Sequence, residues 1–259
     1  MGARGGGPAG PRGRLSPWLR GAWLVALVLG ARRPPPKVPS IEDGWFIKAC
    51  VDVHNELRAK VDPAASNMRY MTWDPDLAKT ARAWVKTCQF KHNTDLKEAK
   101  KFHPSFSSVG ENIWTGSLRL FSVSSAIQNW YNEVHHYTYE THYCSGVCGH
   151  YTQVVWATSY KVGCAVQFCP QVFGHKGLTN AAHFICNYGP SGNYPTHPYK
   201  SGAACSACSE NETCVNKLCR DSSWKADWES FTRNRTLGFV LIAISIFLVL
   251  STAASISAK

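Results

Sequence analysis

The chain has 259 residues, which is long enough for one good-sized domain with additional segments. Its formal net charge is +11, but four arginines fall within the first 20 residues, so the rest of the chain is basic without being extreme. We expect no nucleic-acid partner. The charge favours sulfated glycans or acidic membrane surfaces, or it is simply that of a soluble secreted protein.

Residues 1–31 are predicted to be a secretory signal peptide. An arginine-rich start leads into the uncharged stretch Gly21–Gly30, and small residues follow near Ala31. All eleven cysteines come later in the chain, which predicts disulfides formed in the secretory pathway and one unpaired thiol. Residues 32–44 form a proline-rich lead-in.

Three amphipathic helices are predicted in the first half of the chain. Asp74 is suited to cap the second helix and Pro75 to open it, and the third begins near Ser122. Glu133 falls on the apolar stripe of the third helix, so its carboxylate is expected to have a specific partner. The three stripes comprise Phe46, Cys50, Val53 and Leu57; Leu77, Ala81, Trp84 and Cys88; and Val123, Ala126, Ile127, Trp130 and Val134.

After Trp156 the apolar pattern changes to a period of two, which predicts two antiparallel strands joined by a loop that contains Gly174 and Gly177. Helices followed by a hairpin predict an α+β domain in which helices pack on a sheet. If the strands pair, Cys164 and Cys186 can share a face within bridging distance. The alternating positions are Val162, Cys164, Val166 and Phe168, and Phe184, Cys186 and Tyr188.

Residues 200–220 hold four cysteines in a stretch too short to bury a core, which predicts a small knob held by disulfides. A zinc site there is disfavoured in an oxidising compartment. Asn211 begins an Asn-Glu-Thr glycosylation signal, and Asn234 begins a second one that abuts the apolar tail.

The uncharged segment 237–258 is long enough to span a membrane as a helix. Arg233 and Arg235 precede it, on the wrong side for the positive-inside rule, so a glycolipid-anchor signal is favoured over a retained helix. Attachment would be at Asp221 or Ser222, with residues 221–236 as the stalk. Either anchor predicts the extracellular face of the plasma membrane, or secretion if the tail is lost.

Four segments resemble the CAP superfamily, which comprises cysteine-rich secretory proteins, antigen 5 and plant group 1 pathogenesis-related proteins. They are "HNELR" (54–58), "GENIW" (110–114), "GHYTQVVW" (149–156) and "HFICNYGPSGNYP" (183–195). The resemblance covers residues 45–199 and implies an α-β-α sandwich with a central antiparallel sheet. Residues 200–220 resemble the hinge that follows this domain in cysteine-rich secretory proteins.

The resemblance also implies a cleft lined by four residues, here called the tetrad: His92, Glu111, Glu133 and His150. In the family this cleft takes up a divalent metal, often zinc, so His92 and His150 are the candidate zinc ligands. Glu133 is thus indicated both by helical periodicity and by the resemblance. His54 is expected to be a buried, hydrogen-bonded residue, and the adjacent His135 and His136 make a poor metal pair.

By the same resemblance, four disulfides are implied: Cys88–Cys169, Cys164–Cys186, Cys205–Cys214 and Cys208–Cys219. A bridge between Cys144 and Cys148 is sterically tight and is left open. Cys50 is then the candidate for the odd thiol.

We expect a binding protein and not an enzyme, because the chain lacks both the HExxH and the G-x-S-x-G signatures. Two histidines are also one short of the three protein ligands usual in catalytic zinc sites. The resemblance to the family's glioma pathogenesis-related branch implies a role at sperm surfaces and in gamete interaction, with a cell-surface protein, lipid or sterol as partner. The alternatives are a sterol or lipid carrier, with 172–182 as its variable loop, and, least favoured, a zinc-dependent hydrolase.

Overall fold

The structure, a computed structural model, describes residues 36–98 and 100–222. The predicted signal peptide, most of the stalk and the apolar segment 237–258 lie outside these residues. Among the helices that are described, none is both long enough and apolar enough to cross a membrane.

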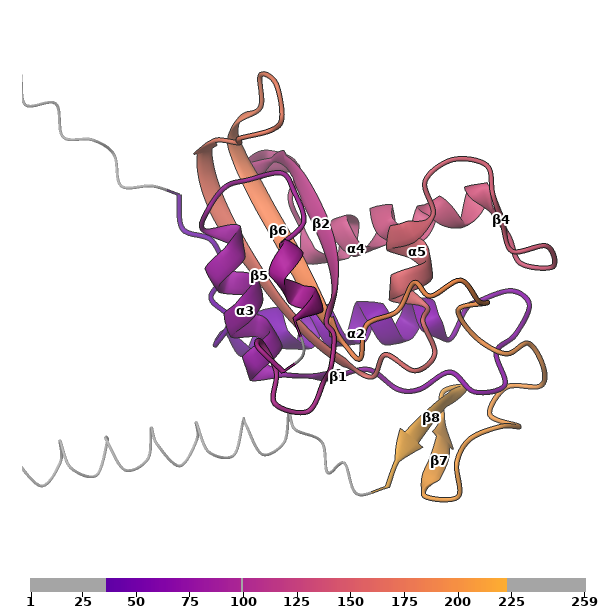
Figure 1. The fold of residues 1–259 in the computed structure, drawn as a ribbon. Coiled ribbons are helices and arrows are strands. Elements are labelled where there is room, and N and C mark those ends of the chain that lie inside the picture. The colour runs from indigo at the N-terminus through magenta and orange to yellow at the C-terminus, as the bar shows by residue number, and fades with distance from the viewer. Residues whose placement is uncertain (1–35, 99, 223–259) are drawn as a thin grey trace, which may run out of the picture. The chain divides into compact units, whose positions relative to one another are not determined.

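A four-stranded sheet forms the centre of the fold (Figure 1). Its order is β1 (Thr72–Trp73), β5 (Lys161–Gln171), β6 (Thr179–Gly189) and β2 (Gly110–Ser117). The strands β5, β6 and β2 pair antiparallel, but β1 pairs parallel to β5, so the sheet is mixed and the prediction of an antiparallel sheet was wrong in this detail. A parallel pair is possible because a long connection that includes helix α3 separates the two strands.

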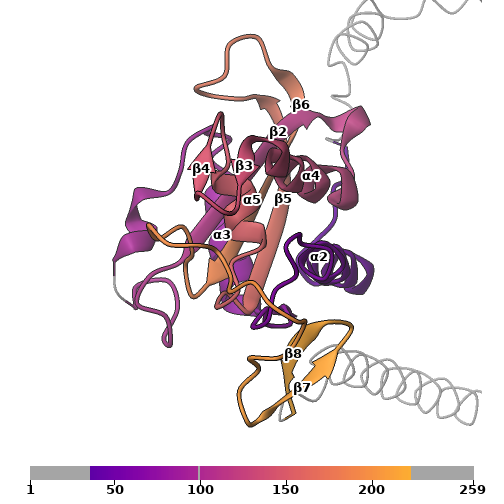
Figure 2. The ribbon, with the colours of Figure 1, turned by 90° about the vertical axis from the view of Figure 1, so that its right-hand side faces the viewer.

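Helices cover both faces of the sheet (Figures 1 and 2). Helix α3 (Pro75–Val85) packs on one face, where Ala165 and Ile185 point. Helices α2 (Gly44–Arg58), α4 (Val123–Tyr131) and α5 (Gly149–Val154) lie on the other face, where Val162 and Phe184 point. The period-two alternation of the two long strands therefore produces the three layers.

Helix α3 begins as predicted but ends earlier. The Asp74 carboxylate accepts from the main-chain N–H groups of Asp76 and Leu77, each at 2.9 Å, and Pro75 occupies the first position. The helix ends at Val85, so Cys88 does not continue its apolar stripe. Cys88 instead has a left-handed backbone, with φ of 52°.

Helix α4 also ends before its predicted stripe does. The Ser122 hydroxyl caps its start, and the α-helix stops at Tyr131. Glu133 and Val134 belong to the 3-10 helix η3 (Asn132–His136), which leads into the short hairpin β3 (Tyr137–Thr138) and β4 (Tyr143–Cys144). The tighter turn redirects Glu133 toward the start of α5.

The C-terminal segment forms the hairpin β7 (Glu212–Val215) and β8 (Leu218–Asp221). It docks on the loop after α2, where the Cys219 N–H donates to Met68 O at 2.7 Å and Arg69 pairs with Glu212 at 2.8 Å. Asn211 is exposed, and its glycosylation stays a prediction. Asp221 ends β8 and Ser222 follows it, and lipid attachment at either residue also stays a prediction.

The structure contains the four disulfides that the resemblance implies: Cys88–Cys169, Cys164–Cys186, Cys205–Cys214 and Cys208–Cys219. Cys144 and Cys148 form a fifth. Cys164 and Cys186 face each other directly in the β5–β6 register, with their Cα atoms 4.0 Å apart. Cys50 is a free, buried thiol, and burial raises the pKa of Cys50 well above its usual value.

Arg58, at the end of α2, is almost fully buried and has no carboxylate partner among the described residues. Its guanidinium donates hydrogen bonds of 2.7–3.3 Å to five main-chain carbonyl groups: Arg69, Val154, Trp156, Ala157 and Ser159. Burial lowers the pKa of Arg58 to about 9, which leaves the side chain charged at neutral pH.

Replacing Arg58 with Met should destabilise the fold by about 4 kcal/mol, because several buried carbonyl oxygens lose their donor at once. Urea unfolding of the two proteins measures this difference. The matched control is Arg82→Met, whose side chain is 42% exposed and pairs with Glu42 on the surface. An Arg58→Met protein as stable as Arg82→Met would contradict the structural role of Arg58.

Candidate functional site

His150 and Glu133 form the first half of the tetrad. His150 Nδ1 lies 2.6 Å from Glu133 Oε1, and both side chains are mostly buried. The indole of Trp130 lies parallel to the His150 ring, with centroids 6.4 Å apart. The imidazole is thus held from one side by a carboxylate and from another by an aromatic ring.

Glu133 also caps helix α5. Cys148, at the N-cap position, offers no side-chain hydrogen bond. Glu133 Oε2 instead accepts from the main-chain N–H groups of His150 and Tyr151, at 2.9 and 3.1 Å. A carboxylate is stabilised at a helix start because the first N–H groups lack partners within the helix. Both oxygens of Glu133 therefore have partners within the fold.

His92 and Glu111 form the other half. His92 Nδ1 lies 2.8 Å from Glu111 Oε1, which also accepts from the Asn93 N–H at 3.0 Å. The His92 side chain is 64% exposed, whereas that of Glu111 is only 3% exposed. The hydrogen bond from His92 to the Glu111 carboxylate raises the pKa of His92 above its ordinary value, and partial burial opposes this shift.

The two pairs are each attached to the edge strand β2, at neighbouring residues. Glu111 holds His92, while the next residue, Asn112, donates from Nδ2 to the His150 carbonyl oxygen at 3.0 Å. A Cβ on Gly110 would lie 2.1 Å from Gln153 Oε1, so a larger residue there would displace the amide that accepts from the Gly192 N–H. Asn112 lies in the "GENIW" segment and Gln153 in the "GHYTQVVW" segment, but sequence analysis gave neither residue a role, since a motif does not show which contacts its amides make.

Buried polar atoms remain beneath the exposed imidazole of His92. Glu111 Oε2 and both amide atoms of Asn187 have no hydrogen-bond partner among the described residues. Asn187 faces Glu111 directly in the β2–β6 register. Buried groups of this kind normally bind protein, water or an ion, so the surroundings of Glu111 suit a small polar occupant.

The donor set of the tetrad fits a divalent metal. A carboxylate can only accept, so Nδ1 of each histidine carries the proton and Nε2 is left with its lone pair. Metal-binding histidines usually donate their second ring N–H to a carboxylate in this way. His92 and His150 would therefore hold the metal through Nε2, and Glu111 and Glu133 would orient the rings.

In the described part of the chain, two groups of side chains each place three possible metal-ligand atoms within 4.8 Å of one another. Neither group contains a residue of the tetrad. Cys205, Cys208 and Cys219 are all engaged in disulfides. Asp74 and Asp76 lie at the start of α3 with His103, which contacts Asp74 Oδ2 through Nε2 at 3.2 Å. In that group the Asp74 carboxylate is already the helix cap.

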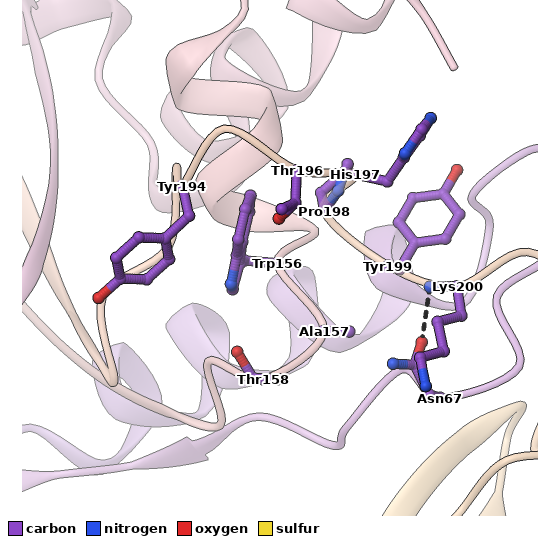
Figure 3. Close-up of a pocket in the computed structure, with 10 residues that line it drawn as sticks. All are labelled: Asn67, Trp156, Ala157, Thr158, Tyr194, Thr196, His197, Pro198, Tyr199 and Lys200. Carbon is purple, nitrogen blue, oxygen red and sulfur yellow. Dashed lines mark hydrogen bonds between the residues drawn. The ribbon is translucent and has the colours of Figure 1, made fainter. Parts of the chain in front are cut away.

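A separate pocket of about 530 Å³ lies away from the tetrad, and none of the four tetrad residues lines it (Figure 3). Trp156 and Tyr194 lie with ring centroids 6.0 Å apart, and the Lys200 N–H donates to Asn67 Oδ1 at 2.9 Å. Sequence analysis did not identify this pocket, because its wall combines three distant segments. The lining comprises Asn67, Trp156, Ala157, Thr158, Tyr194, Thr196, His197, Pro198, Tyr199 and Lys200.

His54 is fully buried, as expected, and lies outside the tetrad. Its Nδ1 lies 2.7 Å from the Cys50 carbonyl oxygen and its Nε2 lies 2.9 Å from the Tyr188 hydroxyl. Burial lowers the pKa of His54 to about 4, so the ring is neutral at physiological pH. His54 therefore joins α2 to β6 and is not available as a ligand.

The chain is similar to known proteins over most of the described residues. A family model described as "CAP: Cysteine-rich secretory protein family" matches residues 51–188. Glioma pathogenesis-related protein 1 of Mus musculus is 50% identical over 247 residues, which is 92% of each chain. GLIPR1-like protein 1 of Bos taurus is 50% identical over 200 residues, 77% of this chain and 81% of its own.

Two solved structures share the fold. The crystal structure of Na-ASP-1 has a TM-score of 0.54 and 28% identity, and the match covers 72% of this chain and 52% of that one. The crystal structure of NaASP2 with Zn²⁺ has a TM-score of 0.53 and 26% identity, and covers 72% of this chain and 98% of that one.

Changing Glu111 to Gln should lower the pKa of His92, because the charged acceptor of its Nδ1–H is lost. In the wild type the raised pKa of His92 contributes stability that is fully present below the unfolded pKa of histidine and is lost as pH rises through the folded pKa. Titration of the histidine ring signals by NMR, in metal-free buffer, measures the shift. Glu140→Gln, an exposed acid outside the tetrad, is the control. An unchanged His92 pKa in Glu111→Gln would contradict the pairing.

Proposed function

The chain belongs to the cysteine-rich secretory protein (CAP) family, and from this premise we propose that it is a binding protein without catalytic activity. In this proposal the tetrad holds a divalent metal as a fixed centre. The protein acts at the extracellular surface of a cell, where its partner is a surface protein, a lipid or a sterol.

The proposal rests on the hydrogen bonds that both carboxylate oxygens of Glu133 make within the fold. A general base must be able to turn toward the water that it deprotonates. Glu133 Oε1 is bonded to His150 Nδ1, and Oε2 is bonded to two main-chain N–H groups that start α5. Moving this carboxylate to a reacting water would undo the cap of the helix that carries His150. These contacts support a positioning role for Glu133.

The remaining tetrad residues support the same conclusion. Glu111 accepts from His92 and from the Asn93 N–H through one oxygen, and its other oxygen is buried. Of the tetrad, only His92 and His150 offer ring nitrogens, one fewer than the three protein ligands usual in catalytic zinc sites. The fold relative NaASP2 was crystallised with Zn²⁺, which supports zinc as the metal held by the histidine pair here.

A role at sperm surfaces and in gamete interaction is the finer proposal. It rests on the resemblance to the glioma pathogenesis-related branch, together with the apolar segment 237–258 that would anchor the chain facing outward. Purified full chain should bind intact gametes saturably, and unlabelled chain should compete. Protease treatment of the cells removes this binding if the partner is a protein.

A lipid or sterol carrier is the second candidate, favoured by the aromatic wall of the pocket in Figure 3. Its polar lining, which includes Asn67, Thr158 and Lys200, suits a ligand with a polar head better than a wholly apolar one. Stoichiometric lipid that co-purifies with the chain, and is lost on Trp156→Ala, would support this alternative over surface recognition.

The full chain should bind one zinc ion per molecule at neutral pH, and the variant His92→Ala/His150→Ala should lose it. The loss is expected because both neutral ring nitrogens are removed. Metal analysis after equilibrium dialysis measures the stoichiometry. His135→Ala/His136→Ala is the matched control, since these two histidines are exposed and outside the tetrad. Zinc retained by the tetrad variant would place the metal elsewhere.

Zinc-loaded chain should hydrolyse peptide, ester and phosphoester substrates no faster than Glu133→Gln does. The comparison tests the absence of catalysis, since a catalytic Glu133 would contribute about a hundredfold or more to the rate. Hydrolysis by the wild type that falls by that factor in Glu133→Gln would overturn the proposed function and restore the hydrolase.

A further inference from the structure

Exposed apolar side chains gather at one end of the sheet, and none of them belongs to the tetrad. Phe90 is 44% exposed, Phe173 is 58% exposed and Leu120 is 75% exposed. Phe90 follows helix α3, Phe173 lies between β5 and β6, and Leu120 ends the 3-10 helix η2 (Leu118–Leu120). Such large apolar side chains on a surface indicate contact with another apolar phase.

The β-sheet register places these segments together. Strand β2 ends at Ser117, opposite Ala181 of β6, and η2 follows at once. Gln171 ends β5 opposite Thr179, which starts β6, so the β5–β6 loop leaves the sheet at this same end (Figure 1). A bridge between Gln89 and Phe173 brings in the segment after α3.

Two of the segments are fixed to each other, which keeps their aromatic rings exposed. The disulfide Cys88–Cys169 joins them covalently. The Phe90 N–H donates to Phe173 O, and the Phe173 N–H donates to Cys88 O, each at 2.8 Å. The His175 ring meets Phe90 edge to face, with centroids 5.7 Å apart. Because these two segments are already ordered, presenting the rings of Phe90 and Phe173 to a partner costs little further conformational entropy.

The lysine and arginine side chains at this end of the sheet are not accompanied by any acidic residue of the same segments. Residues 86–91, 117–121 and 169–179 contain no aspartate or glutamate. Their cations Lys86, Lys91, Arg119 and Lys176 are all exposed. We call these three segments the basic aromatic end. Cationic side chains around exposed apolar ones complement a surface that is anionic outside and apolar beneath.

We propose that the basic aromatic end docks on an anionic lipid bilayer. Phe90, Phe173 and Leu120 enter the boundary between headgroups and acyl chains, and the surrounding lysines and arginine contact the lipid phosphates and carboxylates. A sulfated glycan would satisfy the cations but would leave the three apolar side chains in water. This contact does not rest on the proposed function of the tetrad, although His92 directly follows Lys91 in the chain.

Flotation of the full chain with vesicles tests the proposal, using phosphatidylcholine alone or mixed with phosphatidylserine. Wild-type binding should rise with phosphatidylserine and fall with added salt. Each lysine removed should weaken the phosphatidylserine-dependent binding by about fivefold. Phe90→Ser/Phe173→Ser should weaken it by about tenfold or more, because two exposed rings no longer insert. Lys91→Gln/Lys176→Gln is the charge variant.

Matched controls carry similar changes elsewhere. Tyr143→Ser removes a side chain that is 61% exposed on β4, and Lys60→Gln/Lys79→Gln removes two exposed lysines remote from this end of the sheet. The segment 237–258 is present in every variant, so its own lipid affinity cancels in the comparison. Thermal unfolding verifies that each variant is folded, as expected for exposed positions.

The proposal is overturned if the wild type binds equally to both vesicle types. It is also overturned if the phenylalanine and lysine variants of the basic aromatic end bind as well as the wild type. Losses as large in the two controls would do the same, since they would indicate a general charge effect. Retained vesicle binding in the phenylalanine variant, together with loss of heparin binding in the lysine variant, would assign the surface to sulfated glycans instead.

Discussion

The buried guanidinium of Arg58 links helix α2 to the segment that follows α5. Taking a cation out of water is costly, and here five carbonyl oxygens compensate for the lost hydration. One of them belongs to Val154, the last residue of α5, where the helix dipole also favours a positive charge. The path of residues 154–159 is therefore set by hydrogen bonds to a side chain almost a hundred positions earlier, and the placement of α5 depends on it.

The geometry around His150 follows from that placement. Helix α5 has only six residues and no capping side chain of its own, so it depends on contacts at both ends. Arg58 holds its C-terminal end, Glu133 holds its N-terminal end, and Asn112 holds the His150 carbonyl group against β2. These three contacts are hydrogen bonds, and the disulfide Cys144–Cys148 additionally ties the N-cap residue of α5. The bridges Cys88–Cys169 and Cys164–Cys186 fix the sheet and its loops, while one half of the tetrad is positioned by hydrogen bonds to buried polar and charged groups.

The features that depend on residues close together in the chain, such as a helix start or the face of a strand, were predicted from the sequence. Asp74 followed by Pro75 started a helix where expected, and alternation placed Cys164 opposite Cys186. Family resemblance was needed to bring His92 together with Glu111, since residues on separate elements share no pattern along the chain. Arg58 ends the "HNELR" segment, but its burial was not predicted, because an arginine at the end of an amphipathic helix usually faces water. Its partners are carbonyl groups, which every residue carries, so the sequence does not mark them.

The length of β2 separates the two surfaces that the fold offers for binding. Glu111, near the start of the strand, carries half of the tetrad, whereas Ser117 ends the strand beside the basic aromatic end. At about 3.3 Å per residue, these two residues lie about 20 Å apart along the strand. A bilayer boundary region that admits side chains to about 5–10 Å would not reach Glu111. His92 follows Phe90 by only two residues, so docking would bring its exposed imidazole close to the lipid headgroups. Docking at this end of the sheet would therefore place one histidine of the tetrad beside the membrane, while Glu111 lies further along the edge strand.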